Sequence, residues 1–150
     1  MIGYLASRPS RDVVVSGRQL ISRDWWENQS QYFELRISSL VEEEASRGDP
    51  SAVARRAAII ADIPHLAITD RAVVLTQTLV DRQAVPKGSE DDALHIAISA
   101  TQGAHFLLTW NFKHIDNAQT KQRITEVVDS CGYLCPLTCS PEELGEQFHD

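Results

Sequence analysis

The sequence contains no long hydrophobic run, and its amino-terminal residues do not show a basic segment followed by an apolar one. A helix that spans a membrane needs about 20 consecutive apolar residues, and a secretory signal peptide needs the basic-then-apolar order. Because both patterns are missing, we expect a cytoplasmic protein with no membrane partner.

Cysteine is scarce, with only Cys131, Cys135 and Cys139 in the chain. Their number is odd, their spacing matches no common zinc signature, and no fourth metal ligand stands nearby. We therefore expect reduced thiols with a structural role.

Several motifs that carry chemistry are also missing. The chain has no P-loop, no GxGxxG, no GxSxG and no HExxH, which are the local signatures of nucleotide binding, serine hydrolysis and zinc proteolysis. The residues that remain for chemistry are acids, and the formal net charge is −7. A negative chain is poorly suited to broad, nonspecific binding of nucleic acid, although metal ions can neutralise a cluster of acids.

What is present is the composition of an ordinary globular chain, with 43% hydrophobic and 23% charged residues. A chain of 150 residues can bury about 70% of the surface that it exposes when unfolded. We find no repeat, linker or low-complexity tract, and so predict a single domain over residues 1–150.

The apolar periodicity predicts helices alternating with short strands. The expected helices cover residues 10–27, 39–47, 49–61, 69–80, 89–102 and 117–128, and the expected strands cover residues 33–37, 66–68, 104–110 and 133–138. Ser10, Ser39, Asp49, Ser89, Asn117 and Ser140 are the expected helix caps. Alternation of this kind favours an α/β fold with a mainly parallel sheet and helices on both faces. The order begins with a helix, whereas such sheets usually begin with a central strand.

Residues 90–111 are the most informative stretch. Acids fill the first turn of a helix that ends at Gly103, and an apolar strand follows and leads to Asn111. Ligands of open α/β sheets bind beyond the carboxyl ends of the strands, where Asn111 is expected. Mg²⁺ prefers oxygen ligands, so two or three carboxylates in one pocket would hold it.

Each acidic group also has a simpler interpretation. Glu42 and Glu43 fit a solvated helix face, and Glu90 and Asp91 fit first-turn acids that interact with the helix dipole. Asp92 fits either role. His95 fits a packed histidine better than a metal ligand, and Asn111 also fits a turn. These patterns alone predict an α/β domain with an acidic pocket.

Three segments resemble the PIN domain family, and more narrowly its VapC-like branch of ribonuclease toxins. They are DALHIA at 92–97, LLTWN at 107–111 and SSLVEEEASRGDP at 38–50. The likeness extends over residues 3–144. It implies a three-layer PIN-like fold and an Mg²⁺- or Mn²⁺-dependent endoribonuclease that hydrolyses single-stranded RNA as the toxin of a type II toxin–antitoxin pair. The partners implied are an RNA substrate, a cognate antitoxin protein and a second copy of the chain in a homodimer.

The resemblance also implies a set of metal-binding and catalytic residues. Glu44 matches the acid that closes the family's first acidic helix, and Asp92 matches the aspartate that heads the central helix. Asn111 stands where many relatives have aspartate, and it keeps an oxygen ligand without the charge. Asp116, five residues further on, can restore a carboxylate; this expectation comes from its position and not from the family.

The start of the chain departs from the family. Relatives begin with a strand that ends in Asp-Thr-Ser or Glu-Thr-Ser and supplies the first acidic ligand, whereas here the match begins after it, at Ile2 and Gly3. We therefore expect the first central strand to be missing, through a late start or through decay of the copy. Two alternatives remain open. One is a catalytically impaired PIN remnant that binds RNA or a partner, and the other is an unrelated doubly wound domain that uses Mg²⁺ for phosphate-ester chemistry.

Overall fold

The computed structural model describes residues 1–110 and 118–144. A short helix over Ile2–Ala6, which the sequence did not predict, comes first, and the elements after it follow the expected order of helix, strand, helices, strand, helices, strand, helix and strand. The strands are short and parallel and form two two-stranded sheets, β1 with β2 and β3 with β4. The chain is thus mixed α/β, as the alternation predicted, but the described residues form two small sheets where one larger sheet was expected.

The chain divides into two compact units, one of residues 1–65 and 139–150 and one of residues 66–138. The prediction of a single domain over residues 1–150 stays a prediction. No helix of the described ranges is long and apolar enough to cross a bilayer.

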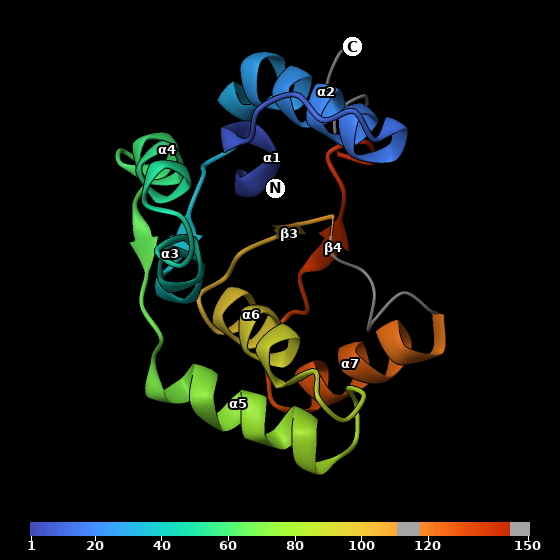
Figure 1. Ribbon diagram of the computed structural model, residues 1–150. Coiled ribbons are helices and arrows are strands. Elements are labelled where there is room, and N and C mark those ends of the chain that lie inside the picture. The colour runs from blue at the N-terminus through green and yellow to red at the C-terminus, as the bar shows by residue number, and fades with distance from the viewer. Residues whose placement is uncertain (111–117, 145–150) are drawn as a thin grey trace. The chain divides into compact units, whose positions relative to one another are not determined.

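The described part of the first unit, residues 1–65 and 139–144, contains four helices. They are α1 (Ile2–Ala6), α2 (Val13–Asn28), α3 (Ser39–Ala45) and α4 (Pro50–Ile60), with a 3₁₀ turn, η1 (Ser30–Tyr32), after α2 and strand β1 (Ile37–Ser38) before α3. Helix α1 packs against α2 and α4, and α3 packs against α4 (Figure 1). Arg55 of α4 donates a hydrogen bond to the Ala6 carbonyl at the end of α1, which satisfies one of the carbonyl groups that a helix end leaves unpaired.

Two of the predicted caps in this unit are displaced. The side chain of Asp12, not Ser10, accepts the hydrogen bond from the Val15 amide at the start of α2. Ser38, not Ser39, caps α3 by accepting from the Val41 amide. Neighbouring Ser and Asp residues compete for the same position, and the one whose backbone is extended takes it. The predicted cap at Asp49 is confirmed, since its side chain accepts from the Ala52 amide.

The strand predicted over residues 33–37 is wrong except at its end, because β1 covers only Ile37–Ser38. Side chains from Phe33 to Ile37 still alternate between more buried and exposed, as the pattern required. The Phe33 ring, however, lies 5.6 Å from the ring of Trp25. Alternating burial therefore arises here from packing of an extended segment onto a helix, without a strand partner along most of its length.

The second unit is built around α5 (Asp70–Asp81) and α6 (Glu90–Thr101), which pack closely together, and α7 (Ala118–Ser130), which packs against α5. Strand β2 (His65–Leu66) stands at the boundary between the units, and β3 (Phe106–Leu108) and β4 (Leu137–Cys139) flank α7 in sequence. Leu75, Leu79, Ile96, Ile98 and Val128 are among the largest fully buried side chains. The strand predicted over residues 104–110 is confirmed in place but is shorter than expected. The strands predicted over residues 66–68 and 133–138 are wrong over most of their length, because β2 shares only Leu66 with the first and β4 only Leu137 and Thr138 with the second.

The three described helices of this unit end in the same motif. The residue after each C-cap has a positive φ angle, 56° at Gln83, 78° at Gly103 and 89° at Gly132. The amide of the next residue donates a hydrogen bond to the carbonyl five positions earlier in the chain, as the Ala104 amide does to the Ser99 carbonyl at 2.9 Å. These are Schellman motifs, and the predicted end of α6 at Gly103 is confirmed.

Candidate metal-binding residues

Three consecutive glutamates lie on helix α3. The helix forms here because the segment after β1 begins at a serine cap and contains good helix formers. All three are exposed. The Glu42 carboxylate lies 3.1 Å from Nδ1 of His65, so this acid forms an ion pair when the imidazole is protonated. This pair could not be predicted from the local pattern, since the partners are 23 positions apart.

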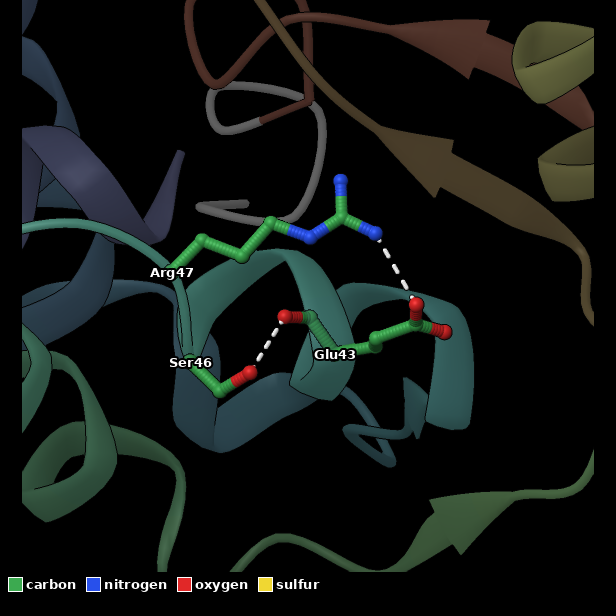
Figure 2. Close-up of polar contacts among 3 residues, drawn as sticks. All are labelled: Glu43, Ser46 and Arg47. Atoms are coloured by element: carbon green, nitrogen blue, oxygen red, sulfur yellow. Dashed lines mark hydrogen bonds and ion pairs between the residues drawn. The ribbon is translucent and has the colours of Figure 1, made fainter.

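Glu43 points along the solvated side of α3, as predicted. The Arg47 guanidinium lies 2.9 Å from its carboxylate, and the Ser46 hydroxyl donates a hydrogen bond to the Glu43 carbonyl at 2.6 Å (Figure 2). The side chains of Arg47 and Glu43 are both more than half exposed. An exposed pair of this type contributes at most about 1 kcal/mol, so Glu43 is best regarded as a surface residue.

Glu44, the residue that matches the family's acid, lies in the last turn of α3 and is exposed. Its carbonyl accepts a hydrogen bond from the Arg47 amide, which helps to close the helix. The α3 acids therefore differ: Glu42 faces His65, Glu43 faces Arg47, and Glu44 occupies the end of the helix.

The second acidic group opens α6. Glu90, Asp91 and Asp92 occupy its first turn, where the amino end of the helix favours negative charge. Glu90 and Asp91 are exposed, whereas Asp92 is half-buried. His95, one turn further on, is also half-buried, and its carbonyl accepts a hydrogen bond from Ser99.

Ser89 occupies the predicted N-cap position of α6, but its hydroxyl does not bond to the helix. The Ser89 side chain is 2% exposed, and its oxygen has no hydrogen-bond partner among the described residues. Its backbone angles, φ −108° and ψ 29°, differ from the extended conformation of an N-cap. The position of the cap was therefore predicted correctly and its hydrogen bond was not.

The predicted ligands fall in different places. Glu44 belongs to the first unit and Asp92 to the second, and Asn111 and Asp116 lie outside the described residues. Within residues 1–110 and 118–144, no three His, Cys, Asp or Glu side chains group so that they could hold a metal ion.

A cavity of about 820 Å³ lies beside the first turn of α6, between the end of α5, the α5–α6 loop and α7. Glu90 lines it together with Lys87 from the loop and Arg123 and Glu126 from α7. The Arg123 guanidinium also donates to the Arg82 carbonyl at 2.9 Å. The sequence did not predict this cavity, because nothing in the local pattern brings α7 next to the α5–α6 loop.

Comparisons with protein-family models, with curated proteins and with solved structures found no match for this chain.

Proposed function

We propose that the chain is a PIN-type, metal-dependent endoribonuclease that acts as the toxin of a type II toxin–antitoxin pair. The observation that carries the proposal is the arrangement of residues 92–108. Asp92 lies in the first turn of α6, the helix ends at Gly103, and β3 begins shortly afterwards, at Phe106. The DALHIA segment begins in the first turn of α6, and the two leucines of LLTWN lie in β3; both positions support the proposal.

The donor set suits a hard cation. Glu44, Asp92 and Asp116 offer carboxylates and Asn111 an amide oxygen, and Mg²⁺ and Mn²⁺ prefer such ligands. A bound ion of this kind activates water and stabilises the leaving oxygen of a phosphodiester. The half-buried position of Asp92 in a first turn would hold one carboxylate in a fixed direction, because the helix backbone restricts its rotamers.

The test combines two measurements on the whole chain. Calorimetry with Mn²⁺ reports metal binding, and cleavage of a labelled single-stranded RNA, with and without EDTA, reports activity. We expect cleavage only with metal, and we expect Asp92→Asn to abolish it while the circular dichroism spectrum is unchanged. Metal-independent cleavage, or full activity of Asp92→Asn, would show that the proposed site is wrong. Metal and RNA binding without cleavage would favour a catalytically impaired remnant.

The proposal includes an antitoxin partner. Carboxylates that bind a cation also attract a guanidinium, which forms charge-assisted hydrogen bonds with them. We therefore expect a small partner protein to inhibit the chain by placing an arginine or lysine among these acids. Co-expression with the product of the adjacent small reading frame, followed by pull-down and the RNA assay, tests this: no complex with a neighbouring product would speak against the toxin role, but not against nuclease activity.

A further inference from the structure

The cavity of about 820 Å³ is lined by described residues of the second unit alone, from the end of α5, the α5–α6 loop, the first turn of α6 and α7 (Figure 1). Its volume lies within the range of sites that bind small molecules, about 300–1,000 Å³. Neither Glu44 nor Asp92 lines it. The cavity is therefore a separate place on the molecule from the acids of the proposed metal site.

The α5–α6 loop forms one wall of the cavity, and its backbone is held in a turn. The Ser89 amide donates a hydrogen bond to the Pro86 carbonyl at 3.1 Å, and Gly88 has a φ angle of 90°. This is the pattern of a type II turn with Lys87 at its second position. Val85, just before the turn, is 7% exposed. The backbone that carries Lys87 thus has a defined conformation between a buried residue and the start of α6.

The opposite wall is helix α7, which two side-chain hydrogen bonds join to the end of α5. The Arg123 guanidinium donates to the Arg82 carbonyl, and the Arg82 guanidinium donates to the Ser130 hydroxyl, both at 2.9 Å. A guanidinium has five N–H donors, so the bond to Arg82 holds the Arg123 side chain in place and leaves other donors for a ligand.

Four charged side chains line the cavity, Lys87 and Arg123 with positive charge and Glu90 and Glu126 with negative charge. No ion pair joins any of them to another charged group within residues 1–110 and 118–144. Glu126 accepts a hydrogen bond from the Gln122 amide at 3.3 Å. Because these charges are not neutralised within the described protein, they can bind the charged and polar groups of a ligand.

The mixed charge of the lining restricts the chemistry of that ligand. A simple anion such as inorganic phosphate would be attracted by the two cations but repelled by the two carboxylates. A ligand with a negative group at one end and hydrogen-bond donors at the other would interact favourably with both. The side-chain amides of Gln119 and Gln122 also line the cavity, and amides offer both donors and acceptors, which suits the polar edge of a nucleobase.

We propose that this cavity binds one nucleotide. Its phosphate lies on Lys87 and Arg123, where charge-assisted hydrogen bonds form, and its ribose hydroxyls and base amino groups donate to Glu90 and Glu126. The nucleotide is either free or one unit of an RNA strand. The second case rests on the proposed function, since Glu90 shares the first turn of α6 with Asp92, whereas binding of a free nucleotide does not depend on it.

Calorimetry on the whole chain with each of the four nucleoside 5′-monophosphates tests the proposal. EDTA is present throughout, so that neither metal binding nor cleavage contributes to the result. We expect at least one nucleotide to bind, and we expect inorganic phosphate and triglycine to bind about tenfold more weakly, because each lacks part of the contacts. Equal binding of phosphate would indicate a simple anion site and equal binding of triglycine a peptide site. Either result would overturn the proposal, as would a failure of all four nucleotides to bind.

Lys87→Gln tests the role of the charge with least risk to folding, because the Lys87 side chain makes no hydrogen bond or ion pair within the described residues. It should weaken nucleotide binding about tenfold. Arg123→Gln should do the same, although it also removes the bond to the Arg82 carbonyl. Arg71→Gln is the matched control, since Arg71 is exposed on α5 and does not line the cavity. Equal affinities of Lys87→Gln and Arg71→Gln would overturn the proposal.

A labelled single-stranded RNA distinguishes the two sources of the nucleotide. Its binding is followed by fluorescence anisotropy in EDTA, with the tightest nucleotide as competitor. Displacement by the nucleotide, together with a similar loss in Lys87→Gln, would assign the cavity to a unit of the RNA strand. RNA binding that neither change affects would assign it to a free nucleotide. Mn²⁺ calorimetry of Lys87→Gln should match the parent, so a failure of the metal site and a failure of this cavity give different results.

Discussion

Ser140 and Glu143 are joined by two reciprocal hydrogen bonds between backbone and side chain. The Ser140 amide donates to the Glu143 carboxylate at 3.1 Å, and the Glu143 amide donates to the Ser140 hydroxyl at 3.3 Å. These are the reciprocal bonds of the capping box that the sequence Ser-Pro-Glu-Glu predicts, although residues 141–144 form a turn and not the expected helix. It fixes the turn directly after β4 and holds the Glu143 carboxylate near the Cys139 thiol.

Ser140→Ala should lower the free energy of unfolding by about 1 kcal/mol, because it removes the acceptor of the Glu143 amide. Urea unfolding followed by circular dichroism measures the difference. Glu142→Gln is the control, since Glu142 is exposed and is not one of the two residues in the capping box; it should change stability little. Equal losses in the two variants would mean that the capping bonds do not contribute.

Stability should fall as the pH rises from about 9 to about 11. Burial, assisted by the negative charge of Glu143, raises the pKa of Cys139 from 9.0 to about 11. In this window the unfolded chain loses the thiol proton while the folded chain keeps it, so ionisation favours unfolding. Burial also raises the pKa of Cys135, which acts in the same direction.

The measurement is urea unfolding at several pH values, for the parent and for Cys139→Ala. The variant should lose stability less steeply across the window, and the slope that remains includes the contribution of Cys135. Parallel curves for the two proteins would show that Cys139 ionises alike in the folded and unfolded chains.

Gln83→Gly should stabilise the chain by about 1 kcal/mol. Gln83 holds the left-handed position of the motif that closes α5, with φ 56°, and this conformation costs a residue with a side chain about 1–2 kcal/mol. Glycine regains only part of that, because it is more flexible in the unfolded chain. Gly103→Ala, at the equivalent position after α6, should destabilise by a similar amount. Thermal and urea unfolding of both variants would measure the effect, and changes of the same sign would contradict this explanation.

The acids of α3 should not be equivalent in metal binding. Glu44→Gln should weaken Mn²⁺ binding about tenfold or more, since it removes a charged ligand of the proposed site. Glu43→Gln, which breaks only the exposed pair with Arg47, should leave the affinity within about twofold, because such pairs contribute little. Asn111→Asp should tighten binding if Asn111 is a ligand. Calorimetry with Mn²⁺ measures the affinity of the three variants. If Glu43→Gln loses as much affinity as Glu44→Gln, the site was assigned to the wrong acid.

The sequence was sufficient for features that depend on neighbouring residues. The cap at Asp49, the capping bonds at Ser140 and the end of α6 at Gly103 arise from contacts within about five residues. The start of the helix predicted over residues 69–80 has the same origin, because the Thr69 side chain accepts a hydrogen bond from the Ala72 amide. Such contacts are encoded by local side-chain chemistry and by the freedom of glycine to adopt positive φ. The acids of α3 and α6 could be placed on their helices for the same reason.

Other features depend on residues that are distant in sequence, and only the tertiary structure decided them. Whether residues 33–37 form a strand depends on the Trp25 ring, and the role of Glu42 depends on His65, 23 positions away. The exposure of Leu20 and the burial of Ser22 reverse what their polarity predicts, because the packing of a whole unit, and not hydrophobicity residue by residue, determines which face of a helix is covered.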